Sequence, residues 1–400
     1  MLSKCIPKPT SYYPPPHFEL PTHIHTSHAQ YMKMTLHASI PTSILLLLPL
    51  LLCPTKVFSD DNVPIPPTKD QVNNWFTANV HPLASRKHLD PALAKAEANV
   101  SHIKVSSDGK GKFKTISDAI NSVPAGNTQR VVISLAGGTY KERVKIERNK
   151  PFITLYGDPA NRPTIVFDST AAKDGTVYSA TVYVLSDYFS AVNIDFVNSA
   201  PRPDGKKPNQ QAVAVTQSGD KASYYNCKMK GFQDTFCDNV GKHFFKDCYI
   251  EGTVDFVFGD GKSLYVNTEL HVIEGDNMAI VTAHGRHTND EDTAYSFAHC
   301  KVTGKGTGGL LGRGWKPFSK VIISYTEIGN CIKPEGWSGM RGNPTNGGTT
   351  FFGEYKNTGP GSNMKMRPKF VRRLTAPEVR PYLTLGFVEA SKWLLPPTKV

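Results

Sequence analysis

The chain has 400 residues, of which 39% are hydrophobic and 20% are charged, so it can bury a large core in one long domain or two ordinary ones. Its formal net charge of +12 favours a polyanionic partner such as an acidic polysaccharide, an anionic lipid or a nucleic acid. No recognised nucleic-acid-binding motif accompanies this charge, which disfavours the last of these partners.

Residues 1–59 are rich in proline, histidine and threonine before they reach the apolar run SILLLLPLLLC at 43–53. A run of this length is typical of a secretory signal and is too short to span a bilayer, so a membrane anchor is the less favoured alternative. We expect translation to begin at Met32 or Met34, with residues 1–31 as an upstream extension or a wrongly assigned start. The sequence therefore predicts a secreted protein without a membrane anchor.

Two of the seven cysteines, Cys5 and Cys53, lie in the predicted leader. The other five are Cys227, Cys237, Cys248, Cys300 and Cys331. Because five is odd, at least one is expected to be a free thiol or to pair between chains. No C-x-x-C spacing indicates zinc and no other ligand cluster presents itself, so we expect no metal and no cofactor. A glycosylation acceptor, Asn-Val-Ser, begins at Asn99.

Residues 60–100 are expected to form an N-terminal extension, and residues 101–400 a single main domain. Residues 113–124, FKTISDAINSVP, alone place apolar residues convincingly along one face of a helix. The rest of the main domain reads as short β-rich runs separated by glycine, asparagine and aspartate. Short helices packed on the outside are expected in the tail, near residues 377–383 and 391–395.

A loose repeat runs through these strands, in which an apolar residue precedes a small polar one and an alternating strand follows. Its polar positions are Asn193, Asn226, Asp247, Asn267, His299 and Thr326, separated by 33, 21, 20, 32 and 27 residues. Irregular steps above a minimum near twenty predict an all-β, right-handed parallel β-helix, with long loops that form a cleft and with helix 113–124 capping its N-terminal end. An antiparallel β-sandwich is the alternative on periodicity alone.

Two aspartates stand 21 residues apart, Asp234 in GFQDTF and Asp255 in GTVDFVFG. That spacing is about one coil of a solenoid, which would stack the two carboxyl groups on one face at roughly the 4.8 Å separation of neighbouring strands. Two carboxylates so close cannot both ionise cheaply, so one is expected to be ionised and the other protonated. The pair would supply a nucleophile and a general acid, which indicates a hydrolase without a serine triad.

The order and content of several motifs resemble the plant pectin methylesterases. These motifs are GGTYKERV (137–144), QAVAV (211–215), GFQDTF (231–236), DFVFG (255–259), LGRGW (311–315) and KPEGW (333–337). The resemblance runs from about residue 100 to 395 and is strongest to the branch without an inhibitor-like pro-domain, which includes pollen-type members. It implies the hydrolysis of methyl esters on polygalacturonate to give pectate and methanol.

The resemblance also implies roles for individual residues. Asp255 matches the nucleophile that forms an acyl-enzyme, and Asp234 matches the acid that protonates methanol and then activates water. Gln211 and Gln233 match the amide donors to the developing oxyanion. Arg313 matches the residue that pairs with Asp255 and keeps it ionised.

Trp315 and Trp337 match aromatic positions that line the cleft, and Phe256 is assigned to substrate binding with them. Tyr140 and Glu142 also fit a family motif but are interpreted as structural. One departure from the family is Gly314, which stands where proline or alanine is usual and would loosen the backbone beside Arg313. Another is the absence of a cysteine from the strand LYVNTEL, which puts the family disulfide there in doubt.

The partners implied by the resemblance are methyl-esterified homogalacturonan in the cell wall and an inhibitor protein that caps the cleft; a monomer is expected. Two rival enzymes share this fold and substrate. A pectate lyase would need acidic calcium ligands with a basic residue, and a polygalacturonase two aspartates placed for inverting hydrolysis. A non-catalytic wall-binding protein is the alternative from another class, although simple binding does not need this acid–base arrangement.

Overall fold

The computed structural model describes residues 60–273, 278–340 and 347–399, and all of them belong to one compact unit. The predicted leader, with its signal sequence, lies outside the described residues. Within the described part, no helix is both long and apolar enough to cross a membrane.

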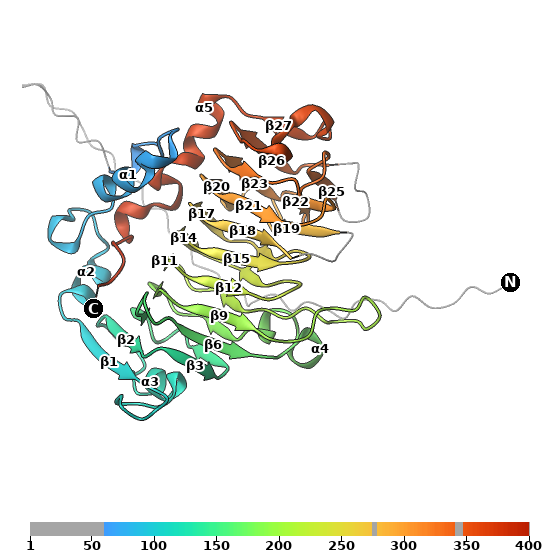
Figure 1. Cartoon of the computed structure of the whole chain (residues 1–400). Coiled ribbons are helices and arrows are strands. Elements are labelled where there is room, and N and C mark those ends of the chain that lie inside the picture. Colours follow the sequence, from blue (N-terminus) through green and yellow to red (C-terminus); the bar gives the residue numbers. More distant parts are fainter. Residues whose placement is uncertain (1–59, 274–277, 341–346, 400) are drawn as a thin grey trace, which may run out of the picture. The chain divides into compact units, whose positions relative to one another are not determined.

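Three β-sheets make up the body of the fold (Figure 1). The first has eleven strands in the order β1 (Ser101–Val105), β2 (Val131–Leu135), β5 (Ile153–Gly157), β8 (Ser190–Val192), β11 (Ala222–Tyr225), β14 (Lys242–Lys246), β17 (Lys262–Val266), β20 (Ala294–Ala298), β23 (Lys320–Ser324), β26 (Phe351–Tyr355) and β27 (Val371–Arg373). The second has eight, β25 (Trp337–Met340), β22 (Gly309–Gly314), β19 (Ala279–His284), β16 (Val257–Gly259), β13 (Phe236–Asp238), β10 (Val215–Gln217), β7 (Val182–Val184) and β4 (Val144–Ile146). The third also has eight, β24 (Glu327–Ile328), β21 (Lys301–Gly304), β18 (Glu269–Val272), β15 (Tyr249–Gly252), β12 (Lys228–Lys230), β9 (Asp195–Asn198), β6 (Pro163–Phe167) and β3 (Gly138–Lys141).

Each successive coil adds one strand to each sheet, and every ladder between the named strands is parallel. This arrangement is a right-handed parallel β-helix, because chain crossovers between parallel strands take the right-handed path. The predicted fold class is therefore confirmed, and the antiparallel sandwich is excluded.

The repeat seen in the sequence marks a turn in which one residue per coil has left-handed backbone geometry. Asn193, Asn226, Asp247 and Asn267 have φ values of 60°, 49°, 58° and 51°. Asparagine and aspartate tolerate this conformation better than most side chains do. Their side chains also join neighbouring coils, since the Asn226 amide donates to Asn193 at 2.8 Å and the Asn267 amide to Asp247 at 2.6 Å. In the last coil of the series the left-handed residue is Tyr325 and not the following threonine.

Inside the coils, equivalent residues of the eleven-stranded sheet form a stack of aromatic rings. Tyr224, Phe245, Tyr265 and Phe297 occupy successive strands in register. Their ring centres are 5.0, 4.3 and 4.4 Å apart, and adjacent rings are within 17° of parallel. These buried rings contribute both apolar area and direct ring contacts to the core.

Helix α3 (Ile116–Asn121) covers the first coil, as the pattern at 113–124 predicted. Its buried side chains join the same core as β1 and β4. Glu142 accepts hydrogen bonds from the backbone N–H groups of Ile116 and Ser117, which satisfies two donors at the helix start. Tyr140 is buried with its hydroxyl on the Ala136 carbonyl, so both residues serve the fold, as interpreted.

The segment before β1 forms two helices that the sequence pattern did not indicate, α1 (Val72–Asn79) and α2 (Pro91–Glu97). In α1, Phe76 stacks on Phe244 of the eleven-stranded sheet with ring centres 5.8 Å apart. The segment also hydrogen bonds to the tail, where the Ile65 N–H donates to the Leu383 carbonyl at 2.6 Å. The segment and the tail together cover much of the outer face of this sheet.

Shorter helical elements complete the described chain. They are α4 (Ala171–Asp174), α5 (Ala376–Val379), η1 (Asp60–Asn62), η2 (Lys69–Gln71), η3 (Leu83–Ser85), η4 (Val177–Ser179), η5 (Pro360–Ser362), η6 (Met364–Met366), η7 (Arg380–Leu383), η8 (Leu385–Val388) and η9 (Ala390–Lys392). The tail elements from α5 to η9 lie near the positions predicted for short helices, and η7 and η8 contact the outside of the eleven-stranded sheet.

A buried ion pair lies at the C-terminal end of the helix. The Glu354 carboxylate accepts from the Arg367 guanidinium at 2.6 Å and from the Trp337 indole at 2.9 Å. Trp337 also stacks on Phe352, with ring centres 4.5 Å apart. The side chains of Arg367 and Glu354 are 2% and 3% exposed, so this ion pair covers the last layer of the core.

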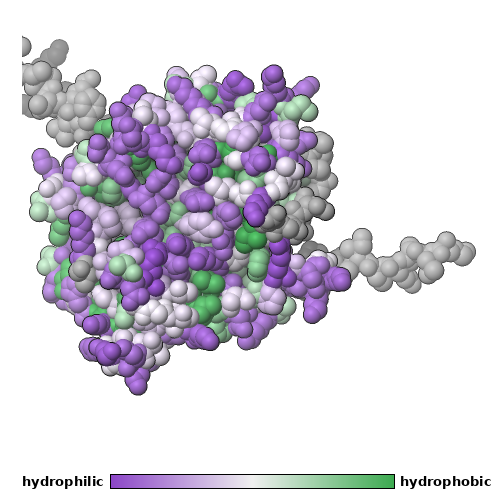
Figure 2. All heavy atoms as spheres, viewed as in Figure 1, coloured by the Kyte–Doolittle hydropathy of each residue, from purple (hydrophilic) through white to green (hydrophobic). Residues whose placement is uncertain are grey.

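The outer face of the third sheet carries charged residues in register. Lys301 is in register with Glu327 of the next coil, and their charged groups lie 3.6 Å apart. On the side of the molecule shown in Figure 2, hydrophilic residues predominate and hydrophobic ones form small separate areas. Exposed pairs of this kind contribute little stability individually, but they keep the face polar.

One ionisable pair is completely buried between the coils. His243 Nδ1 lies 2.5 Å from the Asp238 carboxylate, and its Nε2 lies 2.9 Å from the Gly219 carbonyl. Tyr265 donates its hydroxyl to the other carboxylate oxygen. Burial alone would lower the pKa of His243, but the Asp238 charge and the two hydrogen bonds outweigh it and raise the pKa.

The raised pKa of His243 predicts a pH dependence of stability. A histidine whose pKa is higher in the folded chain contributes stability below its unfolded pKa and loses that contribution as the pH rises through its folded pKa. Replacing His243→Gln should therefore lower the free energy of unfolding most near pH 6, by about 3–5 kcal/mol for a broken buried pair. Urea unfolding from about pH 6 to about pH 9 would measure this; a difference that stays constant with pH would contradict it.

Candidate active site

The two aspartates lie at equivalent positions of adjacent coils, just before β13 and β16. Phe236 of β13 pairs with Val257 of β16. Asp234 lies two residues before Phe236, and Asp255 lies two residues before Val257. Both have left-handed backbone geometry, with φ values of 61° and 53°. The 21-residue spacing therefore stacks the two residues across one coil, as the sequence predicted.

The environment of Asp234 favours its protonated form. The residue is 9% exposed, and its Oδ1 atom has no hydrogen-bond partner among the described residues. Burial, and after it the charge of Asp255, raise the pKa of Asp234 well above its usual value, while the Arg313 guanidinium opposes them. This environment therefore favours the protonated carboxyl group, which is the form that can donate a proton.

Asp255 has a different environment although it is equally buried. The Arg313 Nε atom donates to one carboxylate oxygen at 2.9 Å, and its NH2 group donates to the other, which makes the pair bidentate. Such forked pairs both hold a carboxylate in its charged form and fix its direction. Arg313 therefore forms its forked contact with Asp255, as expected from the resemblance.

The register of the second sheet explains how Arg313 reaches Asp255. Arg313 of β22 pairs with Ala283 of β19, and Ala283 pairs with Phe258 of β16. The arginine must cross one whole coil to reach the turn before β16, and the small side chain of Ala283 lies in the strand between. Trp315 packs beside the guanidinium, 5.3 Å from the ring centre, which is within the range of a cation–π contact.

Gln211 and Gln233 lie on adjacent coils next to the aspartate pair. The Ala212 N–H donates to the Gln233 carbonyl at 3.2 Å, so the residue after Gln211 pairs with Gln233. Both glutamines are partly buried, and the Gln211 Oε1 atom is buried without a hydrogen-bond partner. Within the described residues neither side-chain NH2 donates a hydrogen bond, so both are available to a ligand.

The aromatic residues assigned to substrate binding separate into two groups. Trp315 is 37% exposed and presents a ring at the surface beside Arg313. Trp337 and Phe256 are 2% and 0% exposed. The structure corrects their predicted roles: both belong to the core, where neither offers an open face to a sugar ring.

Phe258 is an aromatic residue of this face that the sequence reasoning missed. It is partly buried and packs in a small apolar cluster with Tyr183 and Cys237, on the outer side of the second sheet. Its position three residues after Asp255 was visible in the motif DFVFG. The turn at Asp255 changes the strand alternation, however, so that Phe256 turns inward and Phe258 outward.

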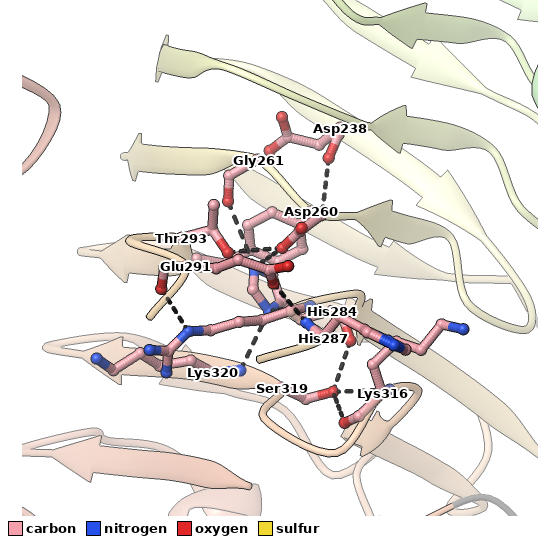
Figure 3. A network of polar contacts seen from close by, with 12 residues as sticks. Asp238, Asp260, Gly261, His284, His287, Glu291, Thr293, Lys316, Ser319 and Lys320 are labelled. Atoms are coloured by element: carbon pink, nitrogen blue, oxygen red, sulfur yellow. Dashed lines mark hydrogen bonds and ion pairs between the residues drawn. The ribbon is translucent and has the colours of Figure 1, made fainter. Parts of the chain in front are cut away.

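His284 ends β19 next to the Arg313 strand, and the sequence assigned it no role. Its ring is fully buried, which lowers the pKa to about 3 and keeps the ring neutral. Nδ1 accepts from the Lys320 N–H at 3.1 Å, while the Ser319 hydroxyl donates to the His284 carbonyl at 2.6 Å (Figure 3). His284 thus anchors the turn that follows Trp315.

The same network includes the loop after His284. Thr293 donates its hydroxyl to Asp260 at 2.6 Å (Figure 3). Arg286 donates to the Glu291 carbonyl at 2.7 Å. Burial raises the pKa of Asp260 to about 6. No group of three or more histidine, cysteine, aspartate or glutamate residues able to hold a metal ion occurs in the described ranges.

Fold and site together define the chain as a β-helix hydrolase with a paired aspartate site. The chain belongs to the pectinesterase family, because the model of the family described as Pectinesterase matches residues 102–390. The resemblance seen in the sequence motifs is thereby confirmed.

Curated relatives agree over most of the chain. Pectinesterase 1 of Olea europaea is 56% identical over 346 residues, which are 86% of this chain and 94% of the relative. A pectinesterase of Parthenium hysterophorus is 55% identical over the same shares. Putative pectinesterase 63 of Arabidopsis thaliana is 48% identical over 85% of this chain and 93% of its own length.

Solved structures support the same assignment. A pectin methylesterase from carrot is 28% identical, with a TM-score of 0.68, over 74% of this chain and 97% of that protein. An aspartate-to-alanine mutant of a pectin methylesterase, in complex with a hexasaccharide, has a TM-score of 0.62 at 28% identity over 74% of this chain and 98% of its own. Family membership favours the esterase over the pectate lyase and polygalacturonase alternatives.

The forked contact of Arg313 predicts graded losses of activity. Arg313→Met should lower kcat by about 10²-fold or more, because Asp255 loses the donors that hold it charged and directed. Arg313→Lys keeps the charge but not the fork, so its loss should be intermediate. Initial rates of ester cleavage, with thermal unfolding as a check on folding, would measure both variants. Equal rates for Arg313→Lys and the parent chain would show that charge alone suffices.

Proposed function

We propose that this chain removes methyl esters from homogalacturonan, with Asp255 as the nucleophile and Asp234 as the general acid and base. The observation that carries the proposal is the opposite environments of two stacked carboxyl groups. Asp255 is held by a bidentate arginine, and Asp234 is buried with a raised pKa. One fold position repeated in two coils thereby supplies a charged attacking group and a proton donor.

In the first half of the reaction an Asp255 oxygen attacks the carbonyl carbon of the methyl ester. The carbonyl oxygen becomes an oxyanion, to which the NH2 groups of Gln211 and Gln233 donate. As the bond to the methoxy group breaks, Asp234 gives its proton to the leaving oxygen and methanol departs. The uronate carbonyl is then joined to Asp255 as an anhydride.

In the second half Asp234, now ionised, takes a proton from a water molecule. The resulting hydroxide attacks the uronate carbonyl of the anhydride, and the bond to Asp255 breaks. Asp255 leaves as a carboxylate that Arg313 again stabilises, and Asp234 keeps the proton for the next ester. The new galacturonic acid loses its own proton to solvent, so charge and atoms balance over the cycle.

The substrate proposed is the methyl-esterified polymer and not an isolated ester. The partly exposed Trp315 gives one flat face beside the reacting atoms on which a sugar ring could stack. The hexasaccharide complex of a structurally similar pectin methylesterase supports a sugar-chain ligand. The chain's net positive charge suits an acidic polymer product.

Location and partners follow from the same reading. The apolar run at 43–53 supports secretion to the cell wall, and Asn99 is exposed just before β1, where a glycan would have room. Residues 101–400 would form the catalytic domain, with residues 60–100 as an extension packed on its outer face. We further infer a monomer whose cleft an inhibitor protein of the cell wall could cover.

Substituting either aspartate should abolish turnover while leaving polymer binding. For Asp255→Asn no anhydride can form, and for Asp234→Asn methanol has no proton donor, so methanol release from highly methylated pectin should fall by at least ~10²-fold in each. Binding to immobilised pectin should change little, because neither amide alters the shape of the cleft.

A matched control is Asp247→Asn, which changes an aspartate in the same type of left-handed turn on the outer edge of the coil. It should keep full methanol release. If both site variants retained activity, the assignment of nucleophile and acid would be wrong; if the folded parent chain released no methanol, the proposed function itself would be.

A further inference from the structure

A second cavity lies on the outer face of the eleven-stranded sheet, whereas the aspartates lie at the second sheet. Its volume is about 770 Å³, and it is bounded by the sheet, by the segment containing α1 and η3, and by the chain after η9. This volume is in the range of small-molecule sites. None of its lining residues belongs to the proposed catalytic set.

The floor of the cavity is a row of hydroxyl groups from three successive strands. Thr154 of β5, Ser190 of β8 and Ser223 of β11 are in register. The Ser223 hydroxyl donates to Ser190 at 3.1 Å. Thr154 is only 1% exposed, and its buried hydroxyl has no hydrogen-bond partner in the described part of the chain. A buried hydroxyl left unpaired is costly unless something else binds it.

The same outward row changes character further along the sheet. The next two residues in register are Phe244 and Leu264, which the N-terminal segment and the tail cover. The cavity therefore lies over the three polar residues of the row and not over Phe244 or Leu264. The Thr154 oxygen itself is closed off from the cavity, whereas Ser190 is the least buried of the three residues and lines the cavity with a hydroxyl group.

The walls combine aromatic rings with cations held in place. Phe76, Tyr188 and Trp393 line the cavity, together with Arg130 and Lys246. Arg130 is fixed by Glu97 at 2.7 Å and by the Tyr188 carbonyl at 2.7 Å. Lys246 donates to Asn73 at 2.8 Å and lies 5.2 Å from the centre of the Phe76 ring.

The charge of the lining is positive. Four cationic residues, Arg130, Lys221, Lys246 and Lys399, line the cavity with one acidic residue, Glu97; Asp90 and Asp247 pair with Lys221 and Lys246 from outside the lining, so four cations meet three acids, a difference of one positive charge. Lys221 is itself held by Asp90 at 2.9 Å, outside the lining. A ligand that places a carboxylate near these groups and an apolar body against the rings would satisfy both features.

We propose that this cavity, formed by the hydroxyl row of Thr154, Ser190 and Ser223 with Phe76, Trp393 and Lys246, binds a small aromatic carboxylate. The carboxylate accepts from the Ser190 hydroxyl and lies beside the cations. The ring system packs against Phe76 and Trp393. The site is separate from the proposed ester-cleaving site, so it binds its ligand whether or not pectin is present.

The test uses naphthalene-2-carboxylate as the probe and isothermal titration calorimetry on the full secreted chain. We expect saturable one-to-one binding with a dissociation constant of roughly 1 mM or tighter, from the affinity that a ligand of this size reaches per atom. The neutral analogue naphthalene-2-methanol should bind about tenfold more weakly. Equal affinity for the two would overturn the carboxylate assignment, and no saturable binding of the acid would overturn the site.

Two variants separate the cavity from other sites. Leu83→Trp fills the cavity from its partly buried edge and should abolish probe binding, whereas Ala84→Trp adds the same ring at the exposed neighbouring position and should not. Ser190→Ala removes only the hydroxyl and should weaken binding roughly fivefold. Both lining variants should keep full methanol release. Unchanged binding in Leu83→Trp, or displacement of the probe by pectin fragments, would place the probe elsewhere and overturn the proposal.

Discussion

The constraint on which this structure depends is the in-register stacking of parallel coils. Backbone hydrogen bonds keep equivalent residues of neighbouring strands at about the same separation along the whole solenoid. Any side chain that recurs at one position of successive coils must therefore meet its counterpart. In this chain the repeated positions hold aromatic rings inside, asparagine amides at the left-handed turn, hydroxyl groups on one outer face and carboxyl groups on another.

Two of these repeats, the rings and the amides, stabilise the fold, and the carboxyl pair works against it. Stacked rings and amide ladders gain from close approach, since each ring or amide is matched to its neighbour. Two stacked carboxyl groups repel each other when both are charged, and burial adds to the cost. The chain resolves this conflict asymmetrically, by giving Asp255 the forked contact of Arg313 and leaving Asp234 without one. The destabilised arrangement is held because the ladders on either side fix the coil spacing.

The sequence predicted the features that follow from spacing. Asp234 and Asp255 could be placed together because their separation equals one coil, and successive coils could be counted because a polar residue recurs at one position of the repeat. The first coil's cap was predictable from the apolar face of residues 113–124. These inferences need only local chemistry and the coil length.

What could not be predicted depends on contacts between distant segments. Trp337 was assigned to the cleft, but its indole meets Glu354 and Phe352 in a closing layer that also needs Arg367, and no local pattern indicates that layer. Phe256 was assigned to substrate binding, but the turn at Asp255 directs it into the core and leaves Phe258 on the outer side. Helix α1 was not predicted, because its apolar face is short and is stabilised by packing against Phe244 of the sheet, which is distant in the sequence.

The coil between the two aspartates also limits how this chain can change in length. Elsewhere the repeat lengthens to 33 and 32 residues, because turns that project outward accept additional residues without moving the strands. From Asp234 to Asp255 the chain uses 21 residues to form three strands and their turns, with little slack. One residue inserted within a strand there would rotate Asp255 to the opposite side of the sheet. Changes in loop length are therefore tolerated in the turns around the site and not in this coil. Such changes can alter the shape of the cleft while the two aspartates stay aligned.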